Sequence, residues 1–151
     1  MNRTSTLFTL LVIAAAIISL ANSGGAPAGR TGAPNESTCG ASGCHGVQAN
    51  QGSATLEIDF AEEATVYQAG ETYRINVSID GAQNANKNGF EIVALDANDN
   101  NVGEWILALP DDTQTRSSGG REYITHTRAG NERSNWDIDW KAPAEDAGAV
   151  T

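Results

Sequence analysis

Apolar and polar residues alternate along several short stretches of the chain, with the period of a β-strand that buries one face. The alternating apolar residues of the three clearest stretches are Leu56, Ile58 and Phe60; Tyr73, Ile75, Val77 and Ile79; and Trp136, Ile138 and Trp140. Turn residues such as Asp80-Gly81 and Pro143 end these runs. We therefore expect strands whose apolar faces, including both tryptophans, lie in a core.

Shorter apolar runs at 90–95, 105–109 and 123–127 predict three more strands, and we expect Phe90, Ile92 and Ala94 to share one face. The Asp- and Asn-rich segment 96–101 predicts a turn, and the polar segment 111–120 predicts a loop. No sustained helical period follows residue 23. Short strands separated by turn residues predict an all-β sandwich or barrel over 53–151.

The first 52 residues follow neither pattern. Arg3 precedes an apolar run at 7–20, and small residues stand at Ala21 and Ser23, which predicts a signal peptide cleaved after residue 23. Residues 24–52 are rich in Gly, Ala, Ser and Pro and predict an irregular leader without a core of its own. We therefore expect an exported protein of the periplasm, cell surface or extracellular space, with no membrane span after cleavage.

The charge changes which partners are plausible. The formal net charge is −10, and it becomes −11 without Arg3, the one charged residue before position 24. Phosphate backbones bind clustered Lys and Arg, whereas the basic residues here are scattered, so we expect no nucleic-acid partner. A protein or surface ligand, and a redox partner if the chain carries a redox cofactor, remain the expected partners.

The leader holds the only two cysteines, in the string Cys39-Gly-Ala-Ser-Gly-Cys44-His45. Two thiols followed by a histidine can hold a c-type haem through two thioether bonds and an imidazole ligand to the iron. The usual spacer has two residues and this one has four. We predict covalent haem c on Cys39 and Cys44, with His45 as the proximal ligand.

Two alternatives stay open for this string. Export permits a Cys39–Cys44 disulfide that would close a small loop, with His45 incidental. Two thiolates and His45 could also hold zinc, which would need a fourth ligand from His126 or a carboxylate.

A haem on this leader would lack an obvious sixth ligand. The only methionine is Met1, so the mature chain has none, and His126 is the other histidine. A strand-borne histidine is more often hydrogen-bonded within the fold than bound to a metal, although His126 is the one candidate for the sixth position.

The sequence offers no catalytic constellation. Ser117 and Ser118 have no adjacent base, and nothing marks a nucleophile elbow or an oxyanion site. We expect a protein that is not an enzyme.

Several longer strings resemble the Reeler (reelin-type) domain, most closely the bacterial version in choice-of-anchor surface proteins. They are Gly70-Glu-Thr-Tyr73, Asn88-Gly-Phe90, Leu95-Asp-Ala-Asn98, Tyr123-Ile-Thr-His-Thr-Arg-Ala-Gly130 and Asn135-Trp-Asp-Ile-Asp-Trp-Lys-Ala-Pro143. The leader is similar to the N-terminal segment of such proteins, many of which have the shorter Cys-x-x-Cys-His spacing. The resemblance implies an immunoglobulin-like β-sandwich, extracellular placement and a non-catalytic role.

Together these observations predict an exported binding or structural module, with one c-type haem on its leader. An extracytoplasmic mono-haem electron carrier and a disulfide-looped adhesin without a cofactor are the alternatives. Residues 148–151 have the pattern of a strand opening, so we also expect the sandwich to be truncated at its C-terminal end.

Overall fold

The computed structural model describes residues 24–41, 45, 48, 51–61, 65–81 and 87–151. Its elements are β1 (Thr55–Phe60), β2 (Thr72–Asp80), β3 (Glu91–Val93), β4 (Glu104–Ile106), β5 (Thr113–Ser118), β6 (Arg121–His126), the short 3-10 helix η2 (Gly130–Glu132) and β7 (Asn135–Lys141). The expected signal peptide and Cys44 lie outside these residues. Within the described part, no helix is both long and apolar enough to cross a bilayer.

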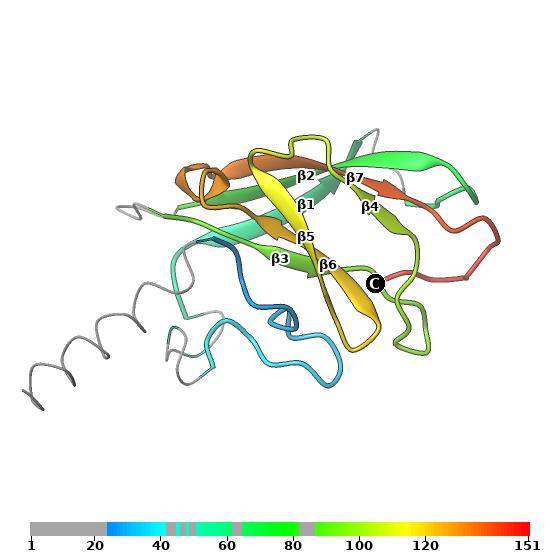
Figure 1. Cartoon of the computed structure of the whole chain (residues 1–151), viewed down its shortest axis with the longest axis horizontal. Helices are drawn as coiled ribbons and strands as arrows, with labels where there is room; N and C mark the ends of the chain where they lie inside the picture. Colours follow the sequence, from blue (N-terminus) through cyan, green and yellow to red (C-terminus); the bar gives the residue numbers. More distant parts are fainter. Residues whose placement is uncertain (1–23, 42–44, 46–47, 49–50, 62–64, 82–86) are drawn as a thin grey trace, which may run out of the picture.

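The strands form two antiparallel sheets that face each other (Figure 1). One sheet has the order β1-β2-β7-β4, and the other has the order β3-β6-β5. This arrangement confirms the prediction of an all-β sandwich. The strands predicted from alternation are all present, although the apolar run at 90–95 contributes only the three residues of β3.

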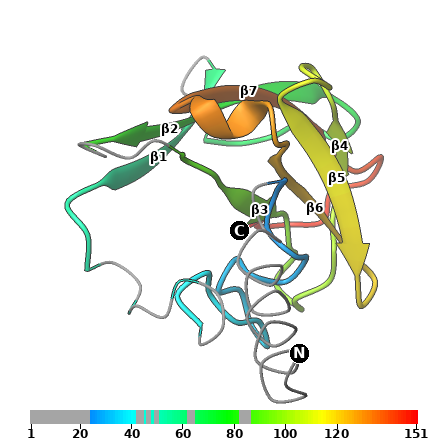
Figure 2. The same ribbon diagram turned by 60° about the vertical axis from the view of Figure 1, so that its left-hand side comes forward.

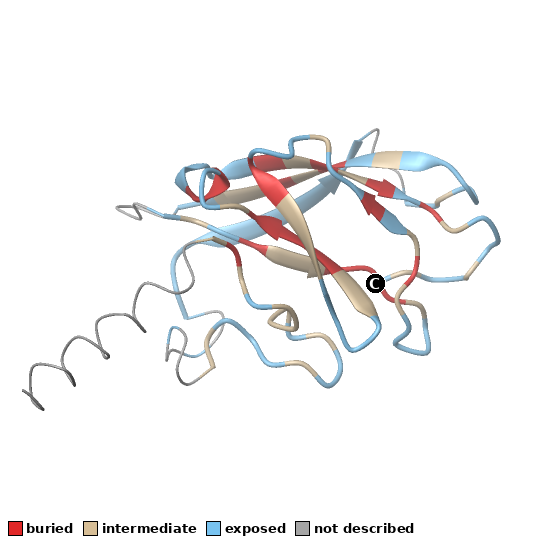
Figure 3. Ribbon diagram, in the orientation of Figure 1, coloured by how far each residue is buried: buried red, intermediate tan, exposed pale blue. Residues whose placement is uncertain are grey.

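The core forms where β2 pairs with β7. Val77 lies opposite Trp136, and Ile75 lies opposite Ile138. All four side chains are buried, as Figure 3 shows for the middle of both strands. Burying a large apolar side chain stabilises a fold by about 1.5–3 kcal/mol, so these pairs are a main source of stability.

Two predictions about individual segments were wrong or incomplete. Residues 113–118 form β5 within the expected loop 111–120, because this strand carries polar residues and shows no alternation. The apolar side chains of β1 face the sandwich interior, yet Leu56, Ile58 and Phe60 remain 53%, 45% and 41% exposed. No strand of the described sheet β3-β6-β5 covers them, because that sheet ends at β3 (Figure 2).

Candidate functional site

The leader lies against the outer face of the sheet β3-β6-β5, on the side away from β2 and β7 (Figure 2). Ala28 and Ala33 pack on a small apolar cluster formed by Val93, Leu95 and Tyr123. The small side chains of the leader allow its backbone to approach the sheet closely. The segment that carries Cys39 is therefore attached to the sandwich.

A buried carboxylate fixes the leader to β6. Arg121 Nη1 donates to Glu36 Oε1 over 2.6 Å, and the Tyr123 hydroxyl donates to the same oxygen over 2.7 Å. Thr31 Oγ1 donates to the other oxygen, Oε2, over 2.6 Å. Arg121 also donates to the carbonyl oxygens of Pro34 and Asp99, so one guanidinium joins the leader to the loop after β3.

This cluster shifts the pKa values of its members. Burial alone would raise the pKa of Glu36, but hydrogen bonds from Thr31, Tyr123 and Arg121, with the charge of Arg121, outweigh it and lower the pKa. Burial and the bond to the Glu36 carboxylate raise the pKa of Tyr123 to about 12. Glu36 is therefore ionised, and Tyr123 is a neutral donor, at neutral pH.

Two further contacts hold the start of the leader. The Gly24 carbonyl accepts hydrogen bonds from Gln114 and Arg116 of β5, over 2.5 and 2.9 Å. Gly25 is buried with φ +105°, and a Cβ there would lie 2.6 Å from the His126 carbonyl oxygen. Only glycine fits both restrictions without strain.

The predicted haem-attachment residues lie just after these anchors. Cys39 is exposed, and its thiol donates to the Arg30 carbonyl with a sulfur–oxygen distance of 3.7 Å. His45 is exposed, and its backbone N–H donates to the Cys39 carbonyl over 3.2 Å. This bond brings the backbones at Cys39 and His45 together, whereas Cys44 lies outside the described residues.

A polar concavity of about 720 Å³ lies beside this segment. Residues from the leader, from the loop 99–101 and from the β5–β6 turn line it, among them Arg30, Glu36 and Arg121. Two charged groups of this hollow, Glu36 and Arg121, bond to each other and so serve the attachment of the leader.

His126 lies apart from this surface, in the interior between β6 and β3. The residue is 8% exposed, and the backbone N–H of Phe90 donates to His126 Nδ1 over 3.2 Å, which requires a ring nitrogen without a proton. Burial is the main cause that lowers the pKa of His126, and the charge of Arg116 lowers it further; a hydrogen bond that the charged ring would donate to the Phe90 carbonyl oxygen acts in the opposite direction. These contacts suit a histidine that stabilises the fold, and a role as sixth haem ligand stays a prediction.

The loop 96–101 is a turn, as expected. Asp96 Oδ1 accepts the backbone N–H groups of Asn98 and Asn100 over 2.8 and 2.9 Å. These hydrogen bonds, chiefly that from Asn100, lower the pKa of Asp96. The carboxylate thus stabilises its own turn, and within the described part of the chain no three His, Cys, Asp or Glu side chains gather as a metal site.

Sequence reasoning missed the cluster of Glu36, Arg121 and Tyr123. No periodicity marks a contact between an irregular leader and a distant strand. The available signal was one acid, Glu36, within a segment made mostly of small residues. A solitary charge in such a segment is consistent with an anchor, but its partner could not be read from the sequence.

Glu36→Gln should loosen the leader. The change removes the charge that accepts three hydrogen bonds and leaves Arg121 without its carboxylate, so we expect a loss of about 1–2 kcal/mol in the free energy of unfolding. Trypsin should also cleave faster after Arg30. Glu57→Gln, on the exposed outward face of β1, is the matched control. Equal stability and equal cleavage in both variants would contradict the anchoring role.

Stability should depend on pH through His126. Its folded-state pKa lies below the ordinary value of 6.5, so the unfolded chain binds the proton more readily. The free energy of unfolding should therefore fall as pH drops from 6.5 towards the folded-state pKa, by at most about 1.4 kcal/mol per pH unit. Urea titrations at pH 8 to 5 measure this slope. His126→Asn should have a lower free energy of unfolding at every pH, and that free energy should change less between pH 8 and 5. If the pH dependence of the variant equals that of the parent chain, His126 is not its source.

Comparison with known proteins agrees with the fold. The family model described as Reeler domain matches residues 37–151. A crystal structure of the human F-spondin reeler domain is 23% identical with a TM-score of 0.52, and the match covers 63% of this chain and 68% of that one. A structure titled as the Reelin-N domain of F-spondin has the same identity and TM-score, with 66% of its chain covered, slightly less than two thirds.

No curated protein sequence matches this chain. At 23% identity the solved structures establish the fold alone. The family match, in contrast, runs from before Cys39 to Thr151 and spans most of the sequence, including β1 to β7. On this match, the chain belongs to the Reeler domain family.

Proposed function

We propose that this chain is an exported, non-catalytic binding and structural module that carries one c-type haem covalently on its leader. Reeler domains are generally extracellular modules without catalytic activity, which supports the first part of the proposal. The observation that carries the second part is the exposure of both Cys39 and His45, on a segment anchored to the sandwich by Glu36.

The described residues fit a covalently held haem. A thioether needs an accessible thiol, and Cys39 is exposed. Iron ligation needs an accessible imidazole, and His45 is exposed with its backbone bonded to Cys39. Each thiol of Cys39 and Cys44 would add across one vinyl group, forming a C–S bond while the thiol hydrogen moves to the neighbouring vinyl carbon. His45 would then bind the iron.

When bound, the haem would supply a one-electron redox centre. Electron exchange with a second protein is therefore the alternative function, because the exposed segment would let a redox partner approach. A disulfide between Cys39 and Cys44, with an adhesive role for the sandwich, is the other alternative. The backbone bond from His45 to the Cys39 carbonyl, which brings these two described residues together, supports this alternative as well.

Haem attachment can be tested directly. The chain is expressed in a host with the periplasmic haem-attachment machinery, then denatured and examined for haem stain and a pyridine haemochrome band. We expect the haem to stay bound after denaturation. The double variant Cys39→Ser, Cys44→Ser should carry no haem, and His45→Ala should change the haem spectrum. His126→Asn is the matched histidine variant, and a change in its spectrum would assign the sixth ligand.

A disulfide in place of the haem would give a different result in the same experiment. A haem-free chain that loses two hydrogen masses on oxidation, with the loss abolished by Cys39→Ser, would exclude haem and establish the disulfide. Because Cys39 and His45 are exposed and follow the anchors of the leader, these variants should keep the fold, which unfolding midpoints would verify.

Export can be tested by the site of cleavage. We expect the secreted chain to begin at Gly24, measured by N-terminal sequencing or intact mass. Ser23→Leu should block cleavage because the position before the scissile bond needs a small side chain. A chain that keeps residues 1–23 and sediments with membranes would contradict the proposal.

A further inference from the structure

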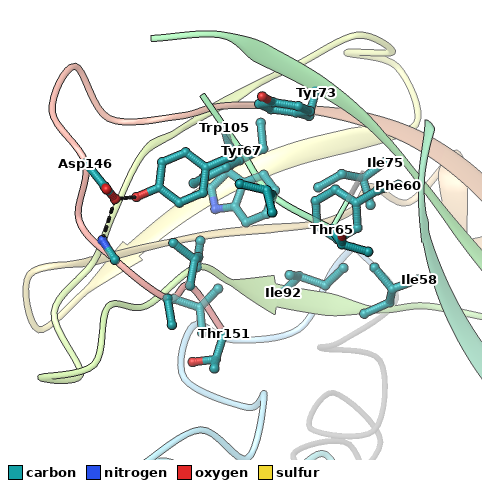
Figure 4. Close-up of a pocket in the computed structure, with 17 residues that line it drawn as sticks. Ile58, Phe60, Thr65, Tyr67, Tyr73, Ile75, Ile92, Trp105, Asp146 and Thr151 are labelled. Atoms are coloured by element: carbon teal, nitrogen blue, oxygen red, sulfur yellow. Dashed lines mark hydrogen bonds between the residues drawn. The ribbon is translucent and has the colours of Figure 1, made fainter. Parts of the chain in front are cut away.

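The interior of the sandwich is open on one side. A groove of about 820 Å³ runs between the two sheets there, and Figure 4 shows its lining. Ile58, Phe60 and Ile92 lie towards one end, the apolar end, and Tyr67 and Asp146 lie at the other, the acidic end. Ligand pockets have volumes of about 300–1,000 Å³ and mostly apolar linings, so this groove has the size of a binding site.

The acidic end carries the charge of the groove. Among the described residues that line it, Asp146 alone has a charged side chain. The few polar groups of a mostly apolar pocket fix the orientation of its ligand. A carboxylate attracts cations, and the net charge of −10 of the whole chain favours their approach. The lining therefore favours a ligand that carries a cationic group.

Hydrogen bonds hold the Asp146 carboxylate in place and leave one of its oxygens available. The Tyr67 hydroxyl donates to Oδ1 over 3.1 Å, and Gly148 N–H donates to the same oxygen over 2.8 Å. The Tyr67 oxygen in turn accepts a bond from Ala147 N–H over 2.8 Å. Within the described part of the chain, Oδ2 accepts no hydrogen bond. Asp146 is exposed, so a ligand can reach this oxygen.

Aromatic rings lie close to this carboxylate. The Tyr67 ring meets the Trp140 ring at an interplanar angle of 85°, with centroids 5.6 Å apart, and the Tyr73 ring lies 6.4 Å from the same indole. All three line the groove, and both tyrosines are only half-buried. The face of an aromatic ring is electronegative and attracts cations, and sites made of several such rings bind quaternary ammonium groups. The acidic end therefore has the composition of a site for an organic cation.

The apolar end would accept the rest of such a ligand. Ile58 and Phe60 are 45% and 41% exposed, so a bound hydrocarbon chain would cover apolar surface that is open to water. Ile92 of β3 adds to this lining from the opposite sheet. An ammonium group alone would leave this surface uncovered, and an uncharged chain would leave Asp146 without a cation. A molecule that combines both groups fits the whole groove.

We propose that the groove binds organic cations that carry a hydrocarbon chain, with the ammonium group at the acidic end and the chain along the apolar end. The assignment names a ligand class for the binding role proposed above. It does not rest on the haem, because the leader lies on the outer face of the sheet β3-β6-β5 and the groove lies on the inner face. Haem stain and ligand titration therefore test the two assignments separately.

Probes with chains of equal length test the preference for a cation. Octyltrimethylammonium, octan-1-ol and octanoate are titrated into the chain by calorimetry, each below the concentration at which it forms micelles. We expect octyltrimethylammonium to bind about tenfold more tightly than octan-1-ol, and octanoate to bind most weakly, because Asp146 attracts the first and repels the last. Equal affinities for octyltrimethylammonium and octan-1-ol would overturn the proposal.

A matched pair of variants locates the cation. Asp146→Asn removes the charge and keeps an oxygen that can accept from Tyr67 and Gly148, so the fold should persist, which melting temperatures verify. It should weaken octyltrimethylammonium binding by about tenfold and leave octan-1-ol binding unchanged. Glu145→Gln removes an equal charge from an exposed neighbour that does not line the groove, and it should change neither affinity. Equal losses in both variants would assign the effect to net charge and refute the site.

Chain length and self-association test the apolar end. Butyltrimethylammonium should bind about tenfold or more weakly than octyltrimethylammonium, because it buries fewer methylene groups. Equal affinities would show that the apolar end takes no part, and the proposal would fail. It would also fail if sedimentation shows a dimer that Ile58→Lys dissociates, since a second copy would then cover the groove. A monomer that binds the longer ammonium probe most tightly is the expected result.

Discussion

The pairing of β2 with β7 is the interaction on which the rest of the structure depends. It places Trp136 at the centre of the core, where the ring contacts Phe90 with centroids 4.9 Å apart. A buried indole needs a partner for its N–H. Trp136 donates to the Gly130 carbonyl over 3.0 Å, so the same side chain that fills the core also fixes the helix η2 beside β7.

The other two tryptophans repeat this arrangement at the sheet margins. Trp140 donates to the Val102 carbonyl over 3.2 Å, and Trp105 donates to the Glu122 carbonyl over 3.3 Å. The bond from Trp105 runs from β4 to β6 and so joins the two sheets. Each large apolar group thereby also fixes a loop or a neighbouring strand, which offsets the cost of burying its polar atom.

The sequence predicted the parts of the fold whose residues alternate. β2 and β7 followed from their patterns because both strands bury one face and expose the other. β5 was missed because Gln114, Thr115 and Arg116 are all polar. The leader itself was predicted, but its contacts with the sheet β3-β6-β5 were not, because small residues have no period. Cys39 and His45 were singled out from their spacing alone and remain a prediction, whereas the Glu36 cluster depends on distant contacts that no local pattern reveals.

The outer faces of the two sheets differ, and this difference separates the cysteine motif from the contacts that hold the fold together. On the sheet with β2 and β7, Arg74 pairs with Asp139, and Asn76 bonds to Asp137 over 2.8 Å, so that face is stable in water. The leader covers the other face. Its anchors end at Glu36, and the cysteine motif begins three residues later. Chemistry at Cys39 and His45 is therefore separated from the contacts that hold the leader. Changes at these residues should therefore leave the fold intact.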